Sequence, residues 1–262
     1  MSDTQPLPPR ATPLHPRRRA IIVGASIGIG AALARRLARE GYTLALLARQ
    51  ENMLRGLCAE INTQFNETRA IAYAHDVTDY DSVPALLQRI LADLGGLDLF
   101  IYNAGISLPV GLKKFDFEKD RRTLATNLLG ALAWLNPVAA MFQSLRSGQI
   151  VGLSSVAGER GRVGNPAYNA SKAALSCYLE ALRNRLSRYR VNVLTVKPGF
   201  VDTAMIKDAK GTFWVISADQ AAKDICRAIR KRRQELYTPA RWRLVMFIIR
   251  NIPSFTFRRL TL

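Results

Sequence analysis

The chain has 262 residues, of which 48% are hydrophobic and 22% charged, and its formal net charge is +18. These values describe a soluble globular chain that can bury one large core, and they exclude a disordered chain, a collagen-like repeat and a multi-span membrane protein. Three scattered cysteines and two histidines argue against a disulfide framework, a zinc ribbon, a His dyad or a His-rich metal site. We therefore expect a cytoplasmic protein without a bound metal, and the excess of positive charge indicates an anionic partner.

The predicted elements alternate between strands and helices along the chain. Residues 1–18 are rich in proline and end in arginines, and we interpret them as a disordered basic arm. Periodicity then predicts, in order, strand 20–24, a helix that ends at Gly41, strand 42–48, helix 51–65, strand 69–74, helix 82–94, strand 97–102, helix 121–145, strand 149–153, helix 167–189, strand 191–196, helix 218–232 and strand 235–237.

The strands of this series are almost wholly apolar, which is typical of a parallel sheet that is covered on both faces. No internal repeat or long linker divides the series. The sequence therefore predicts an α/β fold: a single-domain, Rossmann-type, doubly wound parallel sheet of about seven strands over residues 19–239.

A glycine-rich turn, Gly24-Ala25-Ser26-Ile27-Gly28-Ile29-Gly30, joins the first strand to the first helix. Glycines allow the backbone to turn tightly and to approach a pyrophosphate at the helix N-terminus. A turn without a ligand is the alternative, but the position after the first strand favours a nucleotide. The expected contacts are Gly24, Ser26, Ile27, Gly28, Ile29 and Gly30.

The end of the second strand bears on the choice of cofactor. A carboxylate there would bind a ribose 2′-hydroxyl, whereas this strand is followed by Arg49, whose guanidinium suits a 2′-phosphate. The pattern favours NADPH over NADH, and a solvated surface arginine is the alternative. Asp76, after the third strand, could bind the adenine amino group or could cap a turn into the next helix.

Tyr168 and Lys172 are spaced i, i+4 on a predicted helix, so both lie on one face of it. A cation beside a phenol lowers the phenol pKa from about 10 toward neutrality, as general acid–base catalysis requires. The alternative is a partly buried tyrosine next to an extended lysine. Ser154 and Ser155 end the fifth strand, at the sheet edge where open α/β sheets bind ligands.

In this order the motifs resemble the short-chain dehydrogenase/reductase family over nearly all of residues 20–238. The glycine turn and Asp76-Val77 come first. The later matches are Tyr102-Asn103-Ala104-Gly105, Asn127, Ser155 placed thirteen residues before Tyr168, Tyr168-x-x-x-Lys172, Pro198-Gly199 and Thr203. Each motif alone is modest, but the ordered set is specific.

The resemblance implies interconversion of a carbonyl and a secondary alcohol, with Tyr168 as proton donor or acceptor and Ser155 bound to the substrate oxygen. Lys172 would hold the nicotinamide ribose and lower the Tyr168 pKa, and Asn127 would support a water chain that relays the proton. The cofactor supplies the hydride. The further cofactor contacts that the resemblance implies are Asp76, Val77, Asn103, Ala104, Gly105, Tyr168, Lys172, Pro198, Gly199, Val201 and Thr203. Relatives associate through the two long helices, so a homo-oligomer is expected by analogy.

Three positions depart from the family pattern. Val23 replaces a threonine whose hydroxyl ties the glycine turn to the loop after the fourth strand, and Tyr102 replaces the first asparagine of Asn-Asn-Ala-Gly. These two changes bear on the stability of the turn. Ile27 lacks the basic side chain that some NADP-dependent members carry, so the prediction of a 2′-phosphate site depends on Arg49.

Residues 240–262 contain five arginines and no acid, together with four aromatic residues. The apolar run 244–249 is too short to span a bilayer, and we find no stretch of about 18 apolar residues elsewhere. We interpret 240–262 as a basic amphipathic segment that can lie on an anionic membrane surface. The alternatives are a helix that packs on its own domain or a partner, or one that roofs the substrate pocket. Nucleic acid is a weaker interpretation, because no recognition motif accompanies the charge.

These observations predict an NADPH-preferring oxidoreductase for a hydrophobic or lipid-linked carbonyl compound. Residues 200–216, where the family places its substrate lid, are rich in apolar side chains: Met205, Ile206, Phe213, Trp214 and Val215. One alternative is a reductase of a β-keto acyl thioester, with contacts from Lys113, Lys114, Arg121 and Arg122. Another is a non-catalytic NADPH-binding sensor or membrane scaffold, against which the intact proton donor argues.

Overall fold

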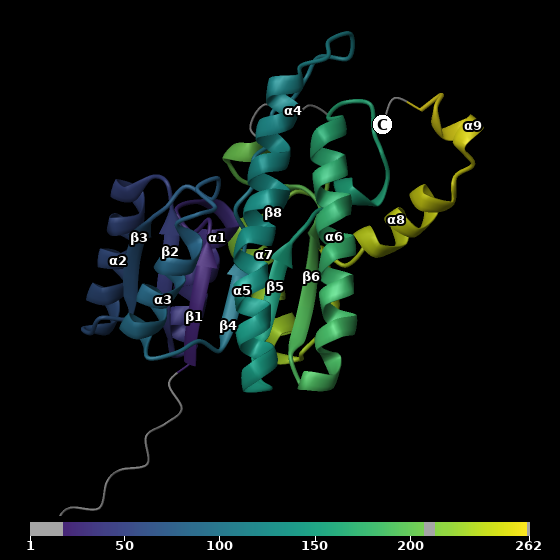
Figure 1. Ribbon diagram of the computed structural model, residues 1–262. Coiled ribbons are helices and arrows are strands. Elements are labelled where there is room, and N and C mark those ends of the chain that lie inside the picture. Colours follow the sequence, from purple (N-terminus) through teal and green to yellow (C-terminus); the bar gives the residue numbers. More distant parts are fainter. Residues whose placement is uncertain (1–17, 207–212, 261–262) are drawn as a thin grey trace, which may run out of the picture.

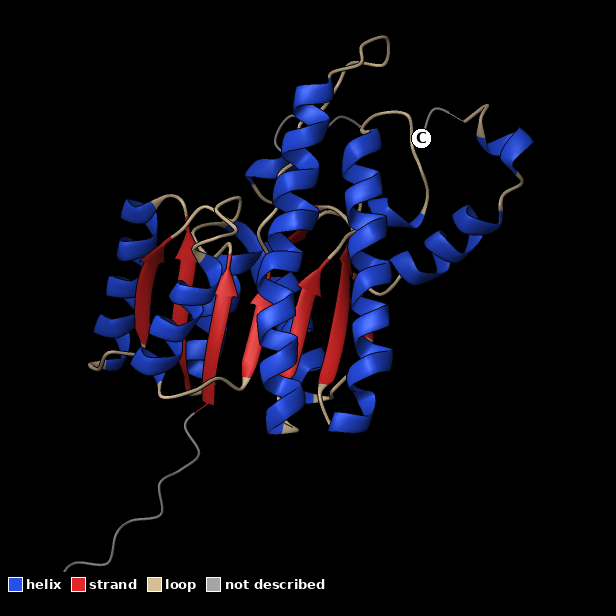
Figure 2. Cartoon of the chain, viewed as in Figure 1, coloured by secondary structure: helices blue, strands red, loops and turns tan. Residues whose placement is uncertain are grey.

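The computed structural model describes residues 18–206 and 213–260, which form three layers around one parallel sheet (Figures 1 and 2). The seven strands have the order β3-β2-β1-β4-β5-β6-β9. Their bounds are β1 Arg18–Val23, β2 Tyr42–Ala48, β3 Ala70–Ala74, β4 Leu99–Tyr102, β5 Gln149–Leu153, β6 Asn192–Pro198 and β9 Glu235–Thr238. The predicted doubly wound α/β fold is confirmed.

Helices cover both faces of the sheet. One face carries α1 (Gly28–Arg39), α2 (Glu51–Phe65) and α7 (Ala218–Arg230), and the other carries α3 (Val83–Leu94), α5 (Gly130–Leu145) and α6 (Pro166–Leu186). Helix α4 (Phe117–Leu124) rises beyond the sheet edge and packs against α6 (Figure 1). Successive side chains of a strand point to opposite faces, so Ile22 packs in the first core and Ile21 in the second. Both are fully buried, which explains the nearly continuous apolar strands.

The helix predicted at 121–145 differs in its start and in its middle. It begins at Phe117, because the side chain of Asp116 accepts a hydrogen bond from Lys119 N and caps it. A π-helical turn, η1 (Ala125–Leu129), separates α4 from α5. By length and composition alone the run Phe117–Leu145 could cross a membrane, contrary to the expectation that the sequence holds no such stretch. Trp134 and Phe142 are nonetheless fully buried in the core, as in the core helix of a globular domain.

The carboxyl ends of the strands meet at the top of Figure 1, and the loops there form the candidate site. This edge carries the 3₁₀ helix η2 (Val156–Glu159) and the short ladder of β7 (Val201–Asp202) with β8 (Ile216–Ser217), and it also carries the 3₁₀ turn η4 (Ala204–Ile206). The 3₁₀ turn η3 (Ser187–Tyr189) follows α6. Of the predicted arm 1–18, residues 1–17 lie outside the described part, and Arg18 begins β1.

The C-terminal segment forms α8 (Trp242–Asn251) and α9 (Ser254–Phe257) at one side of the domain (Figure 1). Trp242 and Met246 are buried in a small cluster with Val156 and Tyr237, and Phe200 packs against it. One face of α8 therefore packs on its own domain, which was one of the alternatives for residues 240–262.

Arg160, just after η2, fastens the end of α8. Its guanidinium donates hydrogen bonds to the carbonyl oxygens of Ile249 (2.7 Å), Arg250 (3.2 Å) and Ile252 (2.5 Å). The same group lies 4.0 Å from the centroid of the Phe257 ring, a cation–π contact. One side chain thus satisfies the free carbonyls of a helix end and holds α9 against it.

An ion network centred on the buried side chains of Lys197 and Glu159 adjoins this contact. Lys197 on β6 is paired with Glu159 at 2.7 Å and Glu235 at 2.5 Å, and Arg250 reaches Glu159 at 3.3 Å. Burial alone would lower the pKa of Lys197, but the two carboxylates raise it overall. The ammonium therefore stays charged throughout the neutral range, and the network joins the sheet to η2 and to α8.

Candidate active site

The glycine turn opens onto a cavity of about 430 Å³ at the carboxyl edge of the sheet. Most of the residues predicted to contact the cofactor line it: Gly24, Ser26, Ile27, Gly28, Ile29, Arg49, Val77, Asn103, Ala104, Gly105 and Thr203. The first backbone N–H groups of helix α1 lie here and, as in every helix, have no partner within the helix. No side chain caps them either. Unpaired N–H groups at the positive end of a helix suit a pyrophosphate, and the residues present fit a dinucleotide.

Close backbone contacts explain the glycines. Gly24 has φ +86°, and a Cβ atom there would lie 2.6 Å from the backbone of Ala104. A Cβ at Gly30 would overlap the carbonyl oxygen of Gly24, so Gly30 serves the packing of α1 and does not line the cavity. Asn103 donates from Nδ2 to Gly24 O at 2.5 Å and from its backbone N to Val23 O at 2.9 Å. These bonds tie the turn to the loop after β4 although Val23 has no hydroxyl.

Arg49 lies at the rim of this cavity with a side chain that is 58% exposed, and its Nη1 is 3.8 Å from Asp76 Oδ2. The Asp76 carboxylate accepts hydrogen bonds from the backbone N and the hydroxyl of Thr78. Burial would raise the pKa of Asp76, but the Thr78 bonds and Arg49 lower it overall. Asp76 thus takes the turn-capping arrangement and does not line the cavity, and its predicted contact with adenine stays a prediction.

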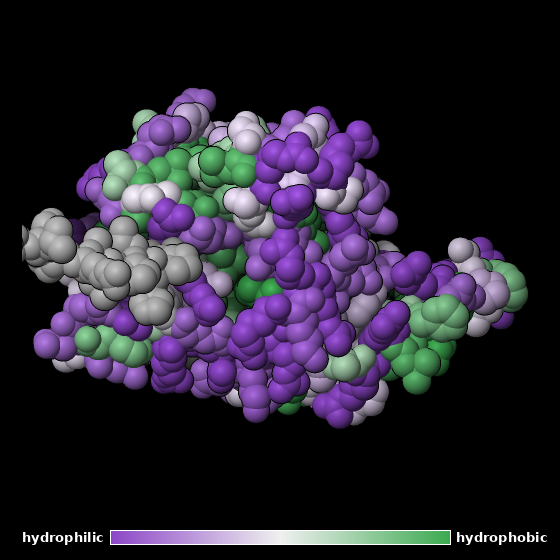
Figure 3. All heavy atoms as spheres, turned by 90° about the horizontal axis from the view of Figure 1, so that it is seen from below, coloured by the Kyte–Doolittle hydropathy of each residue, from purple (hydrophilic) through white to green (hydrophobic). Residues whose placement is uncertain are grey.

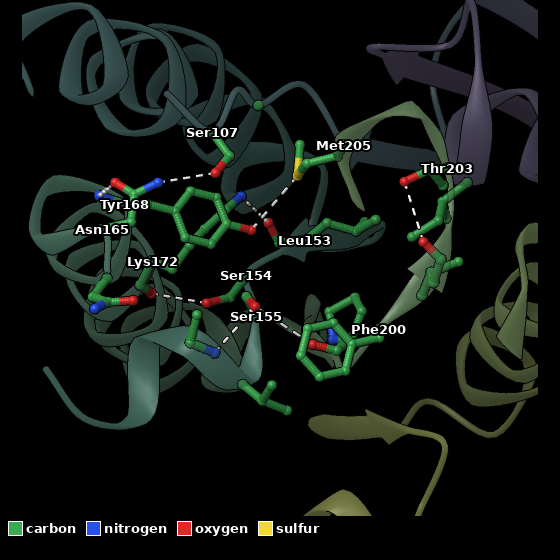
Figure 4. A pocket seen from close by; sticks show the side chains of 18 of the residues that line it. Ser107, Leu153, Ser154, Ser155, Asn165, Tyr168, Lys172, Phe200, Thr203 and Met205 are labelled. Atoms are coloured by element: carbon green, nitrogen blue, oxygen red, sulfur yellow. Dashed lines mark hydrogen bonds between the residues drawn. The ribbon is translucent and has the colours of Figure 1, made fainter. Parts of the chain in front are cut away.

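A second cavity of about 340 Å³ continues from the first, with which it shares Asn103, Gly105 and Thr203 among its lining residues. It is lined by the predicted residues Ser155, Tyr168, Lys172, Pro198, Gly199, Val201 and Thr203 (Figure 4). Asn127 lies behind this wall, because a Cβ at Gly105 would be 3.3 Å from both Asn127 Oδ1 and Lys172 Nζ. The four residues predicted to be catalytic therefore come together from η1, the end of β5 and α6.

The pKa of Tyr168 is raised in the described chain, whereas Lys172 was expected to lower it. Burial raises its pKa, and the Ser155 hydroxyl and the charge of Arg162 only partly oppose this. Lys172 does not lower it here, because its ammonium is 5.8 Å from the ring centroid and donates to Leu153 O at 2.8 Å. The Tyr168 hydroxyl instead contacts the sulfur of Met205 at 3.9 Å (Figure 4).

The environment of Lys172 is itself unusual. The residue is 4% exposed, and burial lowers the pKa of its ammonium to about 8. Ser154 donates to Lys172 O at 2.8 Å and lies 2.7 Å from the Ser176 hydroxyl, so it fastens α6 to the end of β5. Ser155 accepts from Ala157 N at 3.1 Å and has only a long contact, 3.5 Å, with Pro198 O. Its hydroxyl hydrogen can therefore turn toward a ligand.

Asn127 is fully buried and is held by the chain itself. Its Oδ1 accepts from Ile106 N at 2.7 Å, and its Nδ2 donates to Ile106 O at 2.9 Å and to Ser171 Oγ at 3.1 Å. The family-atypical Tyr102 donates its hydroxyl to Thr126 O at 2.7 Å, inside the π-helical turn. Tyr102 thus anchors the turn that carries Asn127, and the predicted water chain at Asn127 stays a prediction.

The cavities are also lined by polar residues that no sequence motif indicated, among them Gln50, Ser107, Arg162 and Asn165. Gln50 accepts a hydrogen bond from Ser26 at 2.9 Å, and its position directly after Arg49 was the available signal. Arg162 lies six residues before Tyr168, but one arginine among 38 basic residues carries no distinguishing signal.

Of the predicted lid 200–216, residues 207–212 lie outside the described part, and the described remainder packs against the C-terminal helix. Phe200, Phe213, Trp214 and Trp242 form one aromatic cluster, with ring centroids 5.2 to 5.8 Å apart. Trp242 also packs directly on Gly199, where no Cβ could fit. Helix α8 therefore supports the wall of the second cavity from behind.

Comparison with known proteins gives a consistent result. A family model described as short chain dehydrogenase matches residues 18–212. An uncharacterized oxidoreductase of Mycobacterium tuberculosis is 32% identical over 216 residues, 82% of this chain and 85% of the relative. The ketoacyl reductase HetN of Nostoc sp. is 30% identical over 215 residues, 82% of this chain and 74% of the relative. A short-chain dehydrogenase from Sphingobium yanoikuyae, solved in complex with NADPH, is 26% identical with a TM-score of 0.78, covering 90% of this chain and 97% of the neighbour.

The matched region contains six of the seven strands, all but β9, together with the residues that line both cavities and the four predicted catalytic positions. The chain belongs to the short-chain dehydrogenase family and is an NAD(P)-dependent oxidoreductase that interconverts alcohol and carbonyl groups.

Proposed function

We propose that this enzyme reduces hydrophobic carbonyl compounds to secondary alcohols and prefers NADPH. The observation that carries the proposal is the meeting of Ser155, Tyr168 and Lys172 on the wall of a largely apolar cavity that continues from the dinucleotide-shaped one. A substrate carbonyl in the second cavity can then reach both a proton donor and the hydride that a bound nicotinamide supplies.

The proposed roles follow from the contacts of each residue. Ser155, whose contact with Pro198 is long, turns its hydroxyl to the carbonyl oxygen and fixes it. Tyr168 gives its proton to the same oxygen, after Met205 has moved away from the hydroxyl. Lys172 keeps one hydrogen on Leu153 O and has two more for the cofactor ribose. Asn127 holds Ile106 in place, and with it the wall next to Gly105.

The preference for NADPH is supported by Arg49 and by the absence of a carboxylate directly after β2. Removing one charge-assisted contact to a 2′-phosphate should weaken binding by roughly 10-fold or more. Arg49→Gln is therefore expected to raise the Kd for NADPH by that factor and to leave the Kd for NADH unchanged. Arg55→Gln, an exposed arginine of α2 paired with Glu51, is the matched control. Equal losses for both cofactors, or equal losses in the control, would contradict the assignment.

The substrate class is supported by the apolar part of the second cavity, formed by Leu153, Val156, Phe200, Val201 and Met205. NADPH oxidation by the purified protein should be measured with hydrophobic ketones, quinones and β-keto acyl thioesters, with Tyr168→Phe as control. Turnover that the substitution abolishes is expected, and turnover that survives it would refute the mechanism. A preference for thioesters would favour the second candidate function, β-keto acyl reduction. The similarity to the ketoacyl reductase HetN supports this candidate.

We also propose that the enzyme binds anionic membrane surfaces through α8 and α9. The outer side of these helices exposes Leu244, Phe247, Ile248 and Phe255, and Figure 3 shows hydrophobic atoms at the end of the molecule where Figure 1 places α8. Residues 240–260 contain five arginines and no acid, which complements anionic lipid. Phe247→Ser combined with Leu244→Ser should reduce co-sedimentation with anionic liposomes, whereas Met53→Ser, an exposed methionine of α2, should not. Equal binding by all three forms would refute attachment through this surface.

A further inference from the structure

Arg162 is a cation in the wall of the candidate active site whose guanidinium has no hydrogen-bonded or ion-paired partner among the described residues. It belongs to the loop between η2 and α6 and lines the second cavity together with Ser155 and Tyr168. Within residues 18–206 and 213–260 its guanidinium donates no hydrogen bond and forms no ion pair, although the side chain is only partly exposed. Its one hydrogen bond uses the backbone oxygen, which accepts from Asn169.

Other buried and half-buried cations of the chain show how unusual this is. Arg160, two residues earlier, donates to three carbonyl oxygens. Lys197 is paired with two carboxylates, and Arg183 donates to Val193 O, Thr195 and Gln234 O. Taking a cation out of water costs free energy unless partners replace the water. Arg162 bears this cost, and the lowered pKa of its guanidinium, caused by burial, reflects it.

The surroundings indicate what would complete the site. The second cavity has apolar walls, the reactive hydroxyls of Ser155 and Tyr168, and the guanidinium as its one cation besides Lys172 among the described lining residues. Lys172 donates to Leu153 and faces the cofactor side next to Gly105. Guanidinium presents a planar fork of donors that matches a carboxylate or a phosphate.

We propose that Arg162 binds an anionic group of the substrate, a carboxylate or a phosphate, so that the enzyme takes amphiphilic carbonyl compounds with an apolar body and an anionic group near the carbonyl. This inference rests on the proposed function, because it places that group relative to Tyr168. In the reduction a hydride is added to the carbonyl carbon and the Tyr168 proton to the oxygen, while the anionic group stays unchanged on Arg162.

A binding experiment tests the subsite without requiring turnover. The protein saturated with NADP is titrated calorimetrically with three ligands of equal chain length: decanoate, decyl phosphate and decanol. A charge-assisted contact predicts that at least one anion binds roughly 10-fold or more tighter than the alcohol. Arg162→Gln should abolish the difference, and Arg162→Lys should keep part of it. No preference in the parent enzyme, no binding of any ligand, or a preference that survives Arg162→Gln would overturn the proposal.

Kinetics separate this role from an effect on the proton donor, since the charge of Arg162 also opposes the rise in the Tyr168 pKa. A medium-chain oxo acid and its methyl ester are compared as substrates. Anion binding predicts that Arg162→Gln raises KM for the acid and leaves KM for the ester unchanged. Equal loss of kcat for both, with a shifted pH profile and no change in KM, would show that Arg162 acts on Tyr168 alone and would overturn the proposal.

Two controls keep the hypotheses apart. Tyr168→Phe should abolish reduction and keep the anion preference, so reduction that survives it refutes the proposed function without touching the subsite. Asp208 is the one acid in the sequence of segment 207–212. Asp208→Asn should leave anion binding unchanged. Tighter anion binding in this variant would mean that the chain itself already neutralises Arg162, against the proposal.

Discussion

Replacing Lys172 by methionine should make the cofactor-free enzyme more stable while it abolishes activity. The ammonium is buried, no carboxylate is paired with it in the described part of the chain, and burial lowers its pKa from 10.5 to about 8. That fall corresponds to about 3 kcal/mol spent at neutral pH on keeping the buried group charged. Methionine has a similar length and removes this cost, but it leaves Leu153 O without its donor, a loss of about 1–2 kcal/mol. The net expectation is a gain of about 1–2 kcal/mol in the free energy of unfolding.

The pH dependence gives this prediction its sharpest test. Between pH 8 and about 10.5 the unfolded chain holds a proton on Lys172 that the folded chain has released, so the parent enzyme gains stability as the pH rises. The methionine variant has no such gain, and its advantage should shrink between pH 7 and pH 10. Urea unfolding of both proteins at the two pH values measures this. Lys223→Met, an exposed lysine of α7, should stay within about 0.5 kcal/mol of the parent.

Two results would refute the reasoning. A methionine variant that is less stable than the parent at pH 7 would mean that the ammonium has favourable partners in the folded state. A stability difference that is equal at pH 7 and pH 10 would mean that Lys172 does not titrate at a lowered pKa. A confirmed gain would identify Lys172 as a residue kept for the reaction at the expense of the fold.

Three further changes have defined outcomes. Lys197→Met should lower the free energy of unfolding by about 3–5 kcal/mol, measured with urea, because it leaves Glu159 buried without its main partner. Adding Glu159→Leu should recover most of this stability, and a loss that is not recovered would contradict the ion-pair explanation. Gly30→Ala should abolish NADPH binding in a fluorescence titration while circular dichroism still shows the fold, since its Cβ would overlap the Gly24 carbonyl; unchanged binding would show that the turn tolerates a side chain. Tyr102→Phe should lower stability by about 1–3 kcal/mol, because a buried backbone carbonyl loses its donor, and should reduce kcat without altering KM; a silent variant would exclude an anchoring role.

The sequence alone was sufficient to predict the helices and strands where the local residue pattern and the burial of the element agree. Strand β2 and helix α2 lie where periodicity predicts them. A short, wholly apolar run is typical of a buried strand, and a longer run with apolar residues every three or four positions is typical of an amphipathic helix. The resemblance to the family implied the grouping of Ser155, Tyr168 and Lys172. The structure places it at the carboxyl edge of the sheet, where Ser155 follows β5 and α6 begins.

The features that were missed depend on contacts between distant segments. The π-helical turn at Ala125–Leu129 goes with the bond from Tyr102, some 24 residues away, and no local propensity encodes it. The role proposed for Arg162 depends on the lack of an acidic partner for it among the described residues, and a sequence does not show which charged groups meet. In the described chain burial raises the pKa of Tyr168, and the Lys172 ammonium donates to Leu153 O. Both the burial and the direction of the ammonium are tertiary properties.

The contact of Arg160 with the end of α8 has a consequence for how the molecule opens. The three carbonyls that it binds lie about 90 residues further along the chain, and the same loop continues from the 3₁₀ helix that follows Ser155. Local unfolding proceeds in cooperative units defined by such shared contacts. The amides of η2 and of the last turn of α8 should therefore exchange with solvent deuterium at matched rates. A partner that binds the outer side of α8 should therefore slow amide hydrogen exchange in η2, next to Ser155, without contacting Ser155 itself.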